Sequence, residues 1–75
     1  MESESGIHIG REIRDEMERQ GRKPEWLAQR LSFDKSNVYK IFKKATLDVE
    51  LLRRISMVLG RDFFKIYSES MGKEM

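Results

Sequence analysis

The residues best suited to chemistry lie in one stretch, 35–44, which holds four lysines, a serine, an asparagine and a tyrosine. Each residue of an α-helix turns about 100° around the axis, so Val38, Ile41 and Phe42 share one apolar side. With that side against a core, the outward side carries Ser36, Lys40 and Lys43, flanked by Asn37, Tyr39 and Lys44, with Lys35 at the helix start. Such donors suit a polyanion, because lysine binds phosphate and donates to guanine.

The charge distribution along the chain points to the same stretch. Residues 21–47 hold seven basic side chains against two acidic ones (+5), residues 1–20 hold three against six (−3), and residues 48–75 hold five of each. A basic face of this kind is the electrostatic footprint of a polyanion partner. The alternative is that these lysines and arginines only solvate helix surfaces.

The apolar periodicity predicts five helices and no strands. The first should span residues 7–20 and stop at Gly21, and the second should begin with Pro24 at its first position. A third should span residues 35–44, and a fourth should lie between the cap Asp48 and Gly60. A fifth should begin at the cap Asp62 and end near residue 67.

The second and third predicted helices should pack closely across residues 32–34, a connection too short for anything but a turn. Leu27, Ala28 and Leu31 share one face of the second helix, and the small Ala28 suits the point where two backbones approach. Phe33 should fill the wedge between the helices. We expect the Asp34 carboxylate to cap the third helix by accepting backbone hydrogen bonds.

This pattern resembles the helix-turn-helix of the Cro and lambda-repressor family of DNA-binding regulators. The resemblance covers residues 7–67, and the segment 48–64 also resembles that family's last two helices. The family usually has glycine where Ser32 stands, so Ser32 should adopt a strained positive φ. Pro24 and Glu25 replace the family's usual Ser or Thr followed by Gln, which reaches a phosphate. The matching positions are Leu27, Ala28, Leu31, Phe33, Val38 and Ile41.

The resemblance implies a compact all-α, five-helix DNA-binding domain whose third helix enters the major groove. It implies a transcriptional regulator acting as a repressor in the cytoplasm of a bacterium or a phage-infected cell. It also implies a homodimer on double-stranded DNA, with half-sites about 34 Å apart. Carried over by position, the base-facing residues are Lys35, Ser36, Tyr39 and Lys40. The phosphate-contacting residues are Lys23, Asn37, Lys43 and Lys44.

Other classes of function find little support in the residues. The chain has no cysteine, and its one histidine, His8, has no second ligand nearby in the sequence, so no metal or cofactor site is expected. No catalytic motif, glycine-rich phosphate loop, membrane span or small-molecule site is recognisable, so we expect neither an enzyme nor a membrane protein. Residues 1–6 should be flexible, residues 7–67 should form the domain, and residues 68–75 should be a frayed tail.

The alternative function is a protein-interaction module of the same fold, such as an antitoxin or an adaptor. A continuous positive face over residues 35–44 would favour DNA. An exposed apolar patch would favour the interaction module, and it would consist of Phe63, Phe64, Tyr67 and Met71.

Overall fold

The computed structural model describes residues 6–74 and contains five α-helices with no strand in that range. The all-α, five-helix prediction is therefore confirmed. Of residues 1–6, which were predicted to be flexible, residues 1–5 lie outside the described part of the chain. The helices are α1 (Ile9–Gln20), α2 (Pro24–Leu31), α3 (Lys35–Phe42), α4 (Val49–Leu59) and α5 (Phe64–Glu74).

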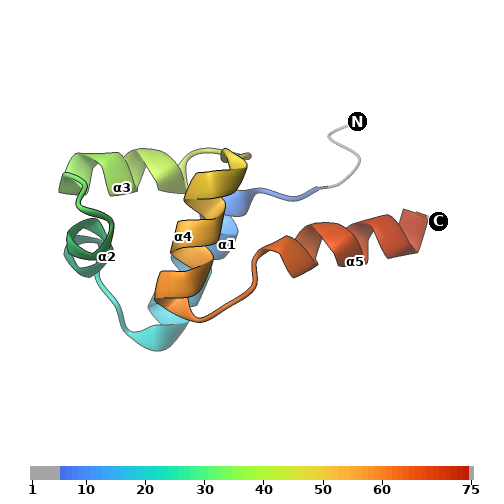
Figure 1. Cartoon of the computed structure of the whole chain (residues 1–75), viewed down its shortest axis with the longest axis horizontal. Helices are drawn as coiled ribbons and strands as arrows, with labels where there is room; N and C mark the ends of the chain where they lie inside the picture. The colour runs from blue at the N-terminus through green and yellow to red at the C-terminus, as the bar shows by residue number, and fades with distance from the viewer. Residues whose placement is uncertain (1–5, 75) are drawn as a thin grey trace.

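Helices α1 to α4 form a compact body, and α5 projects away from it (Figure 1). Helix α3 packs against both α2 and α1, and α2 also contacts α4. The helices are amphipathic, so burying their apolar stripes together forms the core. The buried apolar residues are Ile9, Ile13, Met17, Leu27, Ala28, Leu31, Val38, Ile41, Leu52, Ile55, Leu59 and Phe63.

Most helix ends follow the predicted chemistry. Gly21 and Gly60 end α1 and α4 with φ of 73° and 71°, a left-handed conformation that glycine adopts without strain. Asp48 accepts hydrogen bonds from the backbone N–H groups of Glu50 and Leu51, both at 3.1 Å. Asp34 stands at the cap position of α3, but its side chain accepts no capping hydrogen bond, so that prediction is wrong.

Ser32 ends α2 in the left-handed region, with φ of 59° and ψ of 42°, as the sequence predicts. The next amide, that of Phe33, bonds back to the Ala28 carbonyl at 2.9 Å and closes the turn. On the other side, the Arg54 guanidinium donates to the Leu31 carbonyl at 3.1 Å and lies 5.8 Å from the centre of the Phe33 ring. An arginine of α4 therefore holds the turn between α2 and α3.

Ser32→Gly should stabilise the protein by about 0.5 kcal/mol. Glycine relieves the positive-φ strain, and this gain exceeds the extra entropy that glycine gives the unfolded chain. Urea titration of the two proteins measures the difference. A lower midpoint for the variant would mean that Ser32 is unstrained.

Two helix ends differ from the prediction. Helix α3 ends at Phe42 rather than at residue 44, because the Lys43 and Lys44 amides donate to the carbonyls three residues back, those of Lys40 and Ile41, in a tighter turn. Helix α5 continues to Glu74, so the prediction that it ends near residue 67 in a frayed tail is wrong. The C-terminal part of α5 projects away from the other helices (Figure 1), so its backbone continues without the apolar periodicity that burial would impose.

The start of α1 joins the end of α3 through backbone contacts. The N–H groups of Ile9 and Gly10 donate to the carbonyls of Ala45 and Lys44, both at 2.9 Å. These donors lack partners within their own helix, so α3's exit segment supplies the missing acceptors. A Cβ on Gly10 would lie 2.3 Å from the Ile41 carbonyl oxygen, so only glycine permits this approach.

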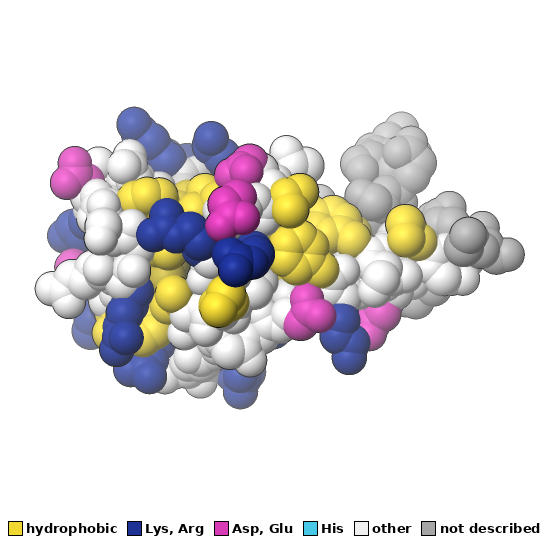
Figure 2. All heavy atoms as spheres, viewed as in Figure 1, with side chains coloured by type: hydrophobic (Ala, Val, Ile, Leu, Met, Phe, Trp, Pro, Cys, Tyr) yellow, Lys and Arg dark blue, Asp and Glu magenta, His cyan; other side chains and the backbone are white. Residues whose placement is uncertain are grey.

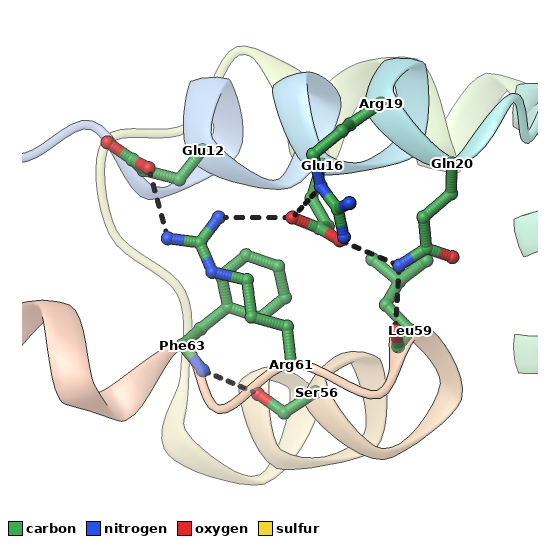
Figure 3. A network of polar contacts seen from close by, with 8 residues as sticks. All are labelled: Glu12, Glu16, Arg19, Gln20, Ser56, Leu59, Arg61 and Phe63. Atoms are coloured by element: carbon green, nitrogen blue, oxygen red, sulfur yellow. Dashed lines mark hydrogen bonds and ion pairs between the residues drawn. The ribbon is translucent and has the colours of Figure 1, made fainter.

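Glu16 is the one charged side chain buried in the described part of the chain, with 5% of its surface exposed. Its carboxylate accepts from Arg19, from Gln20 at 2.8 Å and from Arg61 at 3.5 Å (Figure 3). Gln20 also donates to the Leu59 carbonyl at 2.8 Å. The network ties α1 to the end of α4 and to the segment before α5, and the sequence pattern gave no sign of it.

Hydrogen bonds from Arg19 and Gln20 lower the pKa of Glu16 from the usual 4.5 to about 2, against the opposing effect of burial. The ionised form is favoured in the folded state, so its stabilisation is full above pH 4.5 and falls as the pH approaches 2. Glu16→Gln should therefore lower stability at neutral pH, and the deficit should shrink across that window. Urea unfolding at several pH values measures this, with Glu18→Gln, an exposed carboxylate of the same helix, as control. A deficit that does not change with pH would contradict it.

Candidate nucleic-acid interface

One side of α3 is anchored in the core and the other is free. Val38 is fully buried and Ile41 is 4% exposed, so these two residues fix the rotation of the helix about its axis. That rotation leaves a continuous polar surface on the opposite side. All four residues predicted to face bases are exposed: Lys35, Ser36, Tyr39 and Lys40.

The four residues predicted to contact phosphate are also exposed, but they come from three segments. Asn37 lies on α3, and Lys23 stands at the cap position of α2. Lys43 and Lys44 follow the last turn of α3, where the Lys44 carbonyl is held by the Gly10 amide. The backbone at Lys44 is thus tied to α1, and both lysine side chains are exposed.

Lysine and arginine side chains project along the upper edge of the molecule over α3 (Figure 2). Tyr39, on the same helix as Lys35 and Lys40, has 47% of its surface exposed. Its ring packs edge-on against Phe42 with 6.0 Å between ring centres. Because Phe42 is itself packed against the core, this contact positions an exposed aromatic ring on a basic surface.

Lys35 is the one predicted contact residue that carries an ion pair in the described structure. Its ammonium group lies 3.2 Å from the Glu25 carboxylate, and the two side chains are 52% and 56% exposed. The pair joins the first turn of α3 to the first turn of α2. A hydrogen bond from its own backbone N–H and one from Lys35 hold the pKa of Glu25 below its usual value.

Trp26 packs against the core and carries arginines on its outer side. The guanidinium carbons of Arg22 and Arg30 lie 4.3 and 5.1 Å from the centre of its ring. Both distances are in the range of cation–π attraction. Both guanidinium groups lie against the Trp26 ring, an arrangement that favours a packing role over base stacking. A groove of about 390 Å³ beside it is lined by Gly21, Arg22, Lys23, Glu25, Trp26 and Gln29.

Sequence reasoning missed two features of this surface. The Glu25–Lys35 pair links residues ten apart on different helices, and no rule of helical spacing connects such positions. The stacking of two arginines on Trp26 was also missed, although Arg22, Trp26 and Arg30 follow one another at intervals of four residues. For Trp26 and Arg30, both on α2, that spacing places the side chains on one helix face and was the available signal, whereas Arg22 lies before the helix.

None of the helices in residues 6–74 has the length and apolar character needed to cross a membrane. Searches against protein-family models, curated proteins and solved structures find no match to this chain.

Proposed function

We propose that this protein binds double-stranded DNA through α3 and acts as a transcriptional repressor. The observation that carries the proposal is the exposed basic face of a helix whose other side is locked into the core. Lys35 and Lys40 lie on that helix, Lys43 and Lys44 follow it directly, and all four are exposed. A rigid helix with donors on its free side suits the major groove, where base edges present acceptors.

The alternative, a module that binds a partner protein, rested on an apolar patch at the start of the fifth helix. Phe63 is fully buried in the core, and Phe64 and Tyr67 are half-buried against it. Of the four patch residues, only Met71 is exposed, at 59%. This burial reduces the apolar patch predicted at these four positions, while Met57 of α4 remains 68% exposed and lines a groove together with Phe64. DNA is the first proposal because of the exposed lysines on and after α3.

Selection of bound sequences from a random pool of duplex DNA tests the proposal. We expect enrichment of one sequence, read mainly by Lys35, Ser36, Tyr39 and Lys40. A homodimer on DNA would appear as two inverted half-sites about one helical turn apart. A pool that shows no enrichment and no retention on the protein would contradict DNA binding.

Lys40→Ala and Lys43→Ala should have different effects on DNA binding. Lys40 lies in the last turn of α3 on the face proposed to meet bases, so its loss should reduce the preference for the selected site by about 1–3 kcal/mol. Lys43 follows the helix and is proposed to meet phosphate, so its loss should weaken binding to all duplexes about equally. Competition titrations measure both. Both side chains are exposed, so equal melting temperatures are the control, and unfolding of either variant would contradict the assignment of faces.

A further inference from the structure

A carboxylate stands among the lysines that are proposed to meet DNA. Glu25 lies 3.2 Å from Lys35, and the charge of Lys23 also contributes to lowering its pKa. Its side chain is 56% exposed, so a phosphate approaching Lys23 or Lys35 would meet a negative charge as well. A residue that serves only to strengthen DNA binding would not be an acid at this place.

We infer that Glu25 increases the selectivity of DNA binding. It restrains the Lys35 side chain and weakens binding to random DNA, where Lys35 can contact only phosphate groups. This inference rests on the proposed DNA binding. On random DNA, Lys35 gains a phosphate contact only by leaving Glu25 or by bringing the carboxylate toward the backbone. Both are unfavourable, so nonspecific affinity is reduced.

On the selected site, the same pair has a second effect that offsets the repulsion. Glu25 holds the mobile ammonium group of Lys35 at the first turn of α3, beside the proposed base-facing residues. Lysine otherwise samples many rotamers, and a lysine that is already oriented loses less entropy when it meets guanine. The carboxylate therefore weakens binding to random DNA more than binding to the selected site.

Glu25→Gln tests the inference, because glutamine keeps the size of the side chain and removes its charge. Affinity for a random duplex at low salt should rise about fivefold to tenfold, and affinity for the selected site should rise about twofold or less. The slope of log affinity against log salt on random DNA should steepen by about one. Equal gains on both duplexes, or no gain on either, would overturn the inference while leaving DNA binding in place.

Glu18→Gln is the matched control. Glu18 is also an exposed carboxylate paired with a cation, Arg14 at 3.5 Å, but it lies near the end of α1 away from α3 (Figure 1). The Glu18→Gln variant should leave the ratio of the two affinities unchanged. A change in this ratio equal to that of Glu25→Gln would overturn the inference.

A second variant isolates the role of the pair. In a Lys35→Gln background, Glu25→Gln should change the ratio of the two affinities much less, because the restrained group is gone. An undiminished change would overturn the restraint of Lys35. A native protein that binds neither duplex would instead refute the proposed function, so the two failures are distinguishable.

Discussion

Gly10→Ala should destabilise the protein by about 3 kcal/mol or more, a large share of the stability of a small domain. The added Cβ would lie 2.3, 2.5 and 2.7 Å from the carbonyl oxygens of Ile41, Phe42 and Lys44. These are backbone atoms, so no side-chain rotation can relieve the clash. Helix α1 would have to move off α3 and lose the hydrogen bonds that its first amides make there.

Urea denaturation compares this variant with Gly72→Ala, which makes the same change inside α5. A Cβ on Gly72 meets nothing within 4 Å, and alanine favours helix, so this control should be neutral or slightly stabilising. Equal midpoints for native protein and Gly10→Ala would mean that α1 and α3 do not approach as closely as described.

DNA affinity should fall by about 250-fold to 4,000-fold between 50 and 200 mM salt. About four to six of the seven basic residues in 21–47 should displace counterions from phosphates, which gives a slope of about −4 to −6 per subunit. Lys35 should contribute less than the others, because Glu25 already neutralises part of its charge. Titrations of a fluorescent duplex at several salt concentrations measure the slope.

Lys43→Ala and Lys65→Ala separate the proposed interface from the rest of the surface. Lys43→Ala should make the slope of log affinity against log salt shallower by about one, because one phosphate contact is lost. Lys65→Ala, which removes an exposed lysine of α5, should leave the slope unchanged. A near-flat slope for the native protein would contradict DNA binding, and equal effects of the two variants would contradict the choice of α3.

The order and type of the helices were predictable because they depend on local signals. The apolar spacing of α2 and α4, Pro24 at the start of α2, and the glycines after α1 and α4 each act within a few residues. The rotation of α3 was predictable for the same reason, since Val38 and Ile41 mark its buried side. The exposed residues of the proposed interface follow from that rotation.

Contacts between helices were not predictable from spacing. Glu16 reads as one more surface acid of α1, yet it is buried because Arg61, 45 residues later, folds over it. Gly10 reads as an ordinary helix residue, and its need for a bare backbone appears only when α3 lies beside it. Glu25 likewise acquires its role from a lysine on the next helix. In each case the sequence shows the residue type, but only the folded structure shows which distant part of the chain the residue contacts.

The backbone hydrogen bonds between the start of α1 and the segment after α3 also limit how far the protein can be shortened while keeping its proposed interface. The two helices of the turn motif look like a detachable module, since α2, residues 32–34 and α3 are contiguous. However, the chain leaves α3 on carbonyls whose hydrogen-bond donors belong to α1. A peptide excised around the motif would leave these acceptors to water and release the backbone at Lys44 and Ala45. The first helix is therefore a structural part of the proposed DNA-binding surface, although none of its side chains is proposed to touch the nucleic acid.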